Sequence, residues 1–177
     1  MALAAGDRTR RIRTAGDLAR DAGALAQQLA GLPGERVLVV VDDGYALGVA
    51  LLALWRSAKI AVLPPNGEPG TLLRLRADVA ATLSDREALE NGGALHPLSA
   101  SGSAAPDEAA WPDLDRELLA CELYTSGTTG DGKPVQKRLR HLDDEVAMLE
   151  RRFGACLGST TILGTASPLH LYGLLFR

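Results

Sequence analysis

Ten consecutive residues combine the three kinds of group that bind phosphate. From Tyr124 to Lys133 the chain reads Tyr-Thr-Ser-Gly-Thr-Thr-Gly-Asp-Gly-Lys. Glycines allow backbone amides to approach a ligand closely, hydroxyl side chains donate hydrogen bonds to anionic oxygens, and a lysine adds a mobile positive charge. The combination predicts a polyphosphate site. The alternative is a polar surface turn, because glycine, serine and threonine are common in turns.

This stretch resembles the phosphate-binding signature of the adenylate-forming superfamily, which includes acyl-CoA synthetases, adenylation domains of peptide synthetases and luciferases. The family pattern is an aromatic residue, Thr-Ser-Gly-Thr-Thr-Gly, a variable residue, then Pro-Lys-Gly. The chain departs from it at Gly132, where proline is usual, and at Pro134, where glycine is usual. The hydroxyls and the lysine are retained, which indicates an outlying subfamily. By this resemblance the nucleotide-binding residues are Thr125, Ser126, Gly127, Thr128, Thr129, Gly130 and Lys133.

The resemblance implies ATP-dependent activation of an organic carboxylate, acyl or aryl, with Mg²⁺ as the second cofactor. The carboxylate attacks the α-phosphorus of ATP, pyrophosphate leaves, and the acyl-adenylate is passed to CoA or an acyl carrier protein as a thioester. A later segment, Ala166–Gly173, resembles the next motif of the family and makes His170 a substrate-binding candidate. The alternative for His170 is a hydrogen-bonded histidine at the end of a strand.

Two other functions fit the same loop. Gly127, Gly132 and Lys133 match most of the P-loop pattern of NTPases, which ends in Gly-Lys followed by Ser or Thr. The next residue is Pro134, which has no hydroxyl and disfavours helical geometry at Lys133, whereas a P-loop requires a helix there. The second alternative is a non-catalytic module that binds a phosphate-bearing partner or only packs against another chain.

Composition indicates an ordinary soluble domain and excludes several classes. Of the 177 residues, 46% are hydrophobic and 23% charged, and the net charge is −3. This charge and the 4% of aromatic residues argue against a nucleic-acid partner. We expect no membrane span, no export signal and therefore a cytoplasmic protein. Cys121 and Cys156 have no metal-type spacing and are expected to be buried free thiols.

Hydrophobic periodicity predicts the elements that position the loop. The fold class is α/β, the N-terminal part of an adenylate-forming large domain, with a mainly parallel sheet flanked by helices. Helices are expected from Thr14 to Gly31, over Tyr45–Ser57, Gly70–Arg76 and His141–Phe153, the last capped by Gly154, and strands over Val37–Val41, Ile60–Leu63, Val79–Leu83, Leu118–Tyr124, Val135–Leu139 and Thr160–Thr165.

The acidic turn Asp42-Asp43-Gly44 argues against a dinucleotide site after the first strand. A basic cluster of Lys137, Arg138, Arg140 and His141 is expected to be a solvated face. Residues 91–112 are rich in Gly, Ser, Ala and Pro, and predict a flexible surface connection.

The chain ends in an apolar run, Leu174–Arg177, where a helix should begin. We therefore expect residues 1–177 to be the N-terminal portion of an AMP-binding domain, truncated before the C-terminal catalytic domain and inactive alone.

Overall fold

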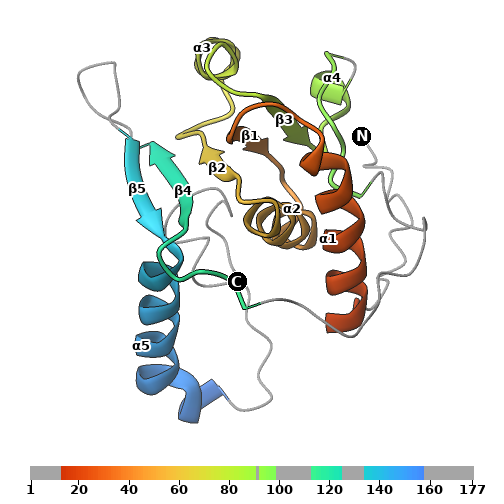
Figure 1. Cartoon of the computed structure of the whole chain (residues 1–177). Helices are drawn as coiled ribbons and strands as arrows, with labels where there is room; N and C mark the ends of the chain where they lie inside the picture. The colour runs from red at the N-terminus through yellow and green to blue at the C-terminus, as the bar shows by residue number, and fades with distance from the viewer. Residues whose placement is uncertain (1–12, 91, 99–112, 125–133, 158–177) are drawn as a thin grey trace, which may run out of the picture.

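The structure, a computed structural model, describes residues 13–90, 92–98, 113–124 and 134–157. Within them, one mixed sheet has the strand order β3-β1-β2-β4-β5 (Figure 1). Neighbouring strands among the first four are parallel, and β5 is antiparallel to β4. This confirms the predicted mainly parallel sheet. The strands are β1 (Arg36–Val40), β2 (Ile60–Leu63), β3 (Ala81–Ser84), β4 (Leu119–Tyr124) and β5 (Pro134–Arg138).

Helices lie on both faces of this sheet. α1 and α2 cover one face, and α3 lies on the other (Figure 1). No helix in the described part of the chain is both long and apolar enough to cross a membrane. The helices are α1 (Ala15–Ala30), α2 (Gly44–Arg56), α3 (Pro69–Arg76), α4 (Glu87–Glu90) and α5 (Leu139–Leu157).

Strand β1 is the centre of the core because both of its faces are covered. Val37 and Val39 pack in the cluster that α1 and α2 form, whereas Leu38 and Val40 pack with Leu72 and other residues on the α3 side. These four side chains are fully buried. An unbroken β-branched and aliphatic run therefore forms a central parallel strand, as the sequence predicts.

The boundaries of α1 and α2 are set by local capping. Thr14 and Asp17 form a capping box at the start of α1, and the Asp43 carboxylate accepts a 2.8 Å hydrogen bond from the Ala46 amide at the start of α2. At the end of α2, the amides of Ala58 and Lys59 donate to carbonyls of the last turn, and Ala58 has φ +52°. This is the hydrogen-bond pattern of a Schellman motif, with alanine where glycine is usual.

The β4–β5 ladder is irregular near its start. The register shifts between Leu119 and Cys121, so that Ala120 is an extra residue on β4. The indole Nε1–H of Trp55, on α2, donates to the Ala120 carbonyl at 2.9 Å. The irregular position is thus attached to a helix that packs in the core.

Two predictions need correction. α5 starts at Leu139 and continues through Gly154 to Leu157, because Gly154 does not adopt the positive φ of a helix cap. The last turns of α5 extend beyond the sheet, so Cys156 is exposed, contrary to prediction. The short helix α4 was not predicted. Within the expected surface connection, Ala94 is buried and Leu95 and Leu98 pack against the core, while residues 99–112 lie outside the described part.

Candidate phosphate-binding site

The predicted phosphate loop connects two strands that the structure describes. β4 ends at Tyr124 and β5 begins at Pro134, and these two residues are paired across the antiparallel ladder. β4 runs parallel to β2, so the connection leaves from the carboxyl edge of the parallel strands. Ligands of open α/β sheets bind at this edge, outside the carboxyl ends of the strands.

At the same carboxyl edge of the sheet, but on the β1–β3 side, polar side chains link the segments that follow β1 and β3. The Asp85 carboxylate accepts hydrogen bonds from the amides of Asp42 and Asp43 at 2.9–3.0 Å. The Arg86 guanidinium pairs with Asp42 at 2.7 Å and holds the pKa of that carboxyl below its ordinary value. Asp42 follows β1, which is two strands from β4, about 10 Å, and Asp85 follows β3, which is one strand further away. An anionic ligand is therefore favoured at the β2–β4 side of the edge.

Side chains near the end of β4 form a network of hydrogen bonds and one ion pair. The Arg36 guanidinium, on β1, donates from Nη2 and Nε to Glu122 Oε2 at 2.8 and 3.0 Å. The other oxygen, Glu122 Oε1, accepts from Gln136 Nε2, on β5, at 3.2 Å. Arg36 also donates to the Tyr124 hydroxyl at 3.3 Å and to the Asp78 carbonyl at 3.1 Å. One carboxylate thus joins three strands next to the predicted loop.

Glu122 is buried, so the charge interaction between Glu122 and Arg36 is less screened by water than an exposed ion pair would be. Glu122 is only 5% exposed, although its neighbours in β4 are apolar residues such as Ala120 and Leu123. Burial tends to lower the pKa of Arg36, but its hydrogen bonds and charge interaction with Glu122 outweigh this and raise it. A buried carboxylate in this position needs the guanidinium, because an unpaired buried charge is strongly unfavourable.

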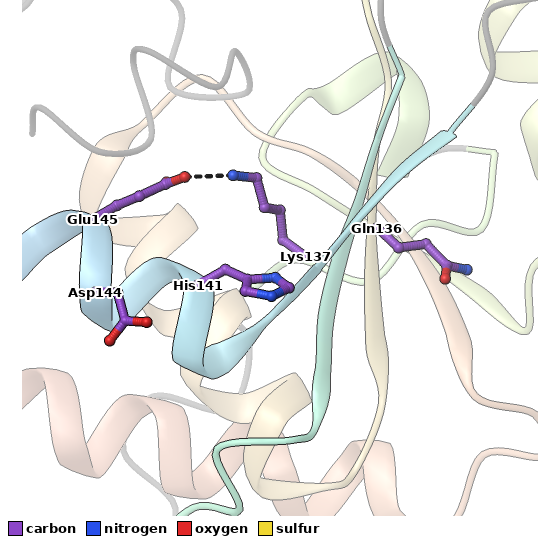
Figure 2. A pocket seen from close by; sticks show the side chains of 5 residues that line it. All are labelled: Gln136, Lys137, His141, Asp144 and Glu145. Atoms are coloured by element: carbon purple, nitrogen blue, oxygen red, sulfur yellow. Dashed lines mark hydrogen bonds and ion pairs between the residues drawn. The ribbon is translucent and has the colours of Figure 1, made fainter.

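The opposite face of the hairpin carries a second polar group, between β5 and α5. Lys137 pairs with Glu145. These two residues, with Gln136, His141 and Asp144, line an open hollow of about 460 Å³ (Figure 2). The Gln136 side chain points away from this hollow, toward Glu122 (Figure 2). Gln136 thus belongs both to the lining of the hollow and to the Glu122 network.

The predicted basic cluster lies at the far end of β5 from the loop. Lys137 is three residues beyond Pro134, about 10 Å along the strand. Arg138 and Arg140 each approach a Glu117 oxygen, at 3.8 and 3.4 Å. These cations have acidic partners, which agrees with a solvated face rather than a phosphate site.

The predicted site residues themselves fall outside the part of the chain that the structure describes. These are Thr125, Ser126, Gly127, Thr128, Thr129, Gly130 and Lys133, together with His170. Their roles therefore remain predictions. Within the described ranges, no group of three or more His, Cys, Asp and Glu residues could hold a metal ion.

The P-loop alternative is wrong. A P-loop requires a helix that begins at its lysine and directs amides toward phosphate. Here the residue after Lys133 is Pro134, the first residue of strand β5, and the next helix, α5, begins at Leu139.

Solved structures with the same arrangement come from adenylate-forming ligases. o-Succinylbenzoate CoA synthetase (MenE) from Bacillus subtilis, in complex with an acyl-adenylate intermediate, matches with a TM-score of 0.69 and 20% identity, over 94% of this chain and 47% of that chain. ATP-bound MatB from Rhodopseudomonas palustris matches with a TM-score of 0.71 and 23% identity, over 90% and 36%. The chain has the fold of the N-terminal part of adenylate-forming ligases.

Two further observations bear on this fold assignment. The N-terminal subdomain of NpsA from Klebsiella oxytoca matches with a TM-score of 0.60 and 23% identity, over 78% of this chain and 38% of that one. The chain thus spans less than half the length of each of these ligases. No protein-family model and no curated protein sequence matches it.

Sequence reasoning missed Arg36, Glu122 and Gln136. The available signal was Glu122, a single acidic residue within the otherwise apolar strand that leads into the loop. A buried acid in such a strand requires a cationic partner, which sequence alone does not identify because the partner is 86 residues away.

Proposed function

We propose that this chain is the nucleotide-binding N-terminal part of an ATP-dependent acid–thiol ligase. The observation that most directly supports this proposal is that the hydroxyl- and glycine-rich loop joins β4 to β5. The connection leaves from the carboxyl edge of a sheet with the fold of adenylate-forming ligases. The proposed reaction converts an organic carboxylate and ATP into an acyl-adenylate and pyrophosphate. A thiol, from CoA or an acyl carrier protein, then takes the acyl group.

The chain's own residues would act on the phosphates of ATP. Pyrophosphate leaves with large negative charge, and stabilising that charge is the main catalytic requirement. In this proposal, Thr125, Ser126, Thr128 and Thr129 donate hydroxyl hydrogen bonds to the β- and γ-phosphates, and the loop glycines present backbone amides. Lys133 supplies a positive charge. No general base is needed, because the nucleophile is already a carboxylate.

Magnesium fits the same proposal. One lysine does not neutralise a triphosphate, and Mg²⁺ binds phosphate oxygens with few protein ligands. MenE has been crystallised with ATP and magnesium ion. When bound, Mg²⁺ would neutralise phosphate charge. The chain's part is to hold the phosphates through the loop hydroxyls, without a dedicated metal cage.

The proposal for the substrate names one residue and a class of acid. His170 would border the carboxylate, and the acid itself is an acyl or aryl carboxylic acid. The expected location is the cytoplasm, where ATP and CoA are available. Because the chain spans 36–47% of the length of the two synthetases, we expect its 177 residues alone to form little or no acyl-adenylate. Acyl-adenylate formation by these residues alone would contradict that expectation.

Carboxylate-dependent ATP–pyrophosphate exchange by the full-length protein tests the function. Lys133→Ala should lower exchange by about 10- to 1,000-fold, as expected for loss of a group that stabilises transition-state charge. Arg151→Ala, which removes an exposed cation from α5, is the matched control and should leave exchange unchanged. Wild-type exchange in the Lys133 variant would refute the loop assignment.

The remaining alternative is a non-catalytic phosphate-binding module. This alternative predicts that the full-length protein binds a phosphate-bearing ligand but shows no ATP–pyrophosphate exchange with any acid in a panel of acyl and aryl acids. Complete absence of ATP binding by the full-length protein would exclude the ligase and leave only the interaction role.

A further inference from the structure

We propose that Arg36 and Glu122 are positioning residues for the phosphate loop, acting through their ion pair on Tyr124 and on the ends of β4 and β5. Glu122 is the buried member of this pair, and the Arg36 side chain is partly exposed. This inference rests on the proposed function, because it assigns a role in nucleotide binding to residues outside the loop. It adds two groups that the loop motif does not contain.

The contacts place this pair at the base of the loop. Glu122 is two residues before the end of β4, and its side chain lies on the same face of the strand as Tyr124. Arg36 contacts both, at 2.8 Å to Glu122 and 3.3 Å to the Tyr124 hydroxyl. The last described side chain before Thr125 is therefore held by a guanidinium that a buried carboxylate fixes.

The same carboxylate also fixes the strand on the other side of the loop. Gln136 is paired with Glu122 in the ladder and donates to its Oε1 at 3.2 Å. Gln136 is two residues after Pro134, where the loop returns. Contacts to Glu122 thus restrain both strands that bound the loop, and they connect those strands to the central strand β1.

The need for fold stability does not by itself explain this pair. A buried ion pair replaced by apolar residues of similar volume often leaves stability unchanged or higher. Ala120, two residues before Glu122 and on the same face of β4, is apolar and fully buried, so apolar side chains fit on this face of the strand. A charged pair at this position is better explained by a requirement for fixed geometry, because the hydrogen bonds of a guanidinium are directional.

The apolar double variant Arg36→Met/Glu122→Leu separates positioning from stability. In the full-length protein, we expect its thermal midpoint to stay within a few degrees of wild type, and the KM for ATP in pyrophosphate exchange to rise about 10- to 100-fold, the effect of a small misplacement of binding groups. Tyr124→Phe, which removes only the hydroxyl, should raise the KM for ATP less. Arg116→Ala, which removes an exposed ion pair with Asp144, is the control and should change neither quantity.

The outcomes distinguish this inference from the proposed function. A wild-type protein without ATP binding or exchange would overturn the proposed function, and the inference with it. An active wild type with an unchanged KM for ATP in the double variant would overturn the inference alone. Should the double variant fail to fold, Glu122→Gln keeps the shape of the side chain and removes its charge. An unchanged KM for ATP in that variant and in Tyr124→Phe would also overturn the inference.

Discussion

The two cysteines show how strongly position controls the chemistry of a single side chain. Cys121 is fully buried in β4, and burial raises the pKa of its thiol to about 12, although the Lys137 charge acts in the opposite direction. Cys156 is exposed near the end of α5. Thiolates, not thiols, are the reactive species. The two side chains should therefore differ in reactivity.

We expect one fast-reacting thiol per native chain. At neutral to mildly alkaline pH, iodoacetamide should label Cys156 within minutes and Cys121 only after denaturation, as judged by peptide mass spectrometry. Cys156→Ser should abolish the fast phase and Cys121→Ser should retain it. Equal labelling of both cysteines in the native chain would contradict the buried position of Cys121.

The Asp42–Arg86 ion pair gives stability a defined dependence on pH. The pKa of Asp42 in the folded chain is lowered from 3.8, chiefly by its hydrogen bond from Arg86. A lowered folded-state pKa adds to the free energy of unfolding above pH 3.8, and this contribution is lost as pH falls through the folded-state pKa. Arg86→Gln should therefore be less stable than wild type at pH 7, and the difference should shrink as the pH falls below 3.8.

Urea unfolding at several pH values measures this difference. Arg151→Gln, on the exposed side of α5, is the matched control and should show no such convergence with wild type at low pH. A constant difference between wild type and Arg86→Gln across the pH range would show that the ion pair does not act through Asp42.

At the scale of elements, helix ends were predictable where they depend on neighbouring residues. Thr14 with Asp17 predicted the start of α1, and the capping box confirms it. The prediction that α5 ends at Gly154 was wrong, because a glycine can also remain inside a helix when the next residues continue the helical hydrogen bonds. The end of α2 was placed within one residue, but its αL position is occupied by Ala58, which no residue pattern indicated.

Ala58→Gly should stabilise the protein. An L-residue in the left-handed region costs about 1 kcal/mol relative to glycine, and Ala58 has φ +52° at the αL position of the helix end. Chemical denaturation should show a gain of up to about 1 kcal/mol. Ala147→Gly, at an exposed position inside α5, is the control and should destabilise by about 0.5–1 kcal/mol. A loss of stability in Ala58→Gly would contradict the assigned backbone conformation.

At the scale of the whole molecule, the parallel sheet was predictable because β1 and β2 are continuous apolar runs separated by an apolar helix. The strand order was not, since β3 pairs with β1 rather than with its predecessor β2. The site was predictable only as a motif. Arg36 and Glu122, which we propose as positioning residues, come from strands distant in sequence and meet only through that strand order.

Hydrogen exchange should report this architecture. β1 lies between β2 and β3, and its residues Val37, Leu38, Val39 and Val40 have fully buried side chains, so their amides should exchange only on global unfolding. Amides of β5, whose side chains are mostly exposed, should exchange faster by local opening. Peptide-resolved mass spectrometry under native conditions measures both. Faster exchange in β1 than in β5 would contradict its central position.

The hydrogen bond between the Trp55 indole and the extra residue of β4 provides an intrinsic optical probe. Because that indole is anchored in α2 and its partner carbonyl belongs to the hairpin, separation of the hairpin from the sheet would expose the ring to water and shift its emission to longer wavelength. With Trp111 replaced by phenylalanine, the emission spectrum of one tryptophan would follow movement of the two strands on either side of the proposed phosphate loop.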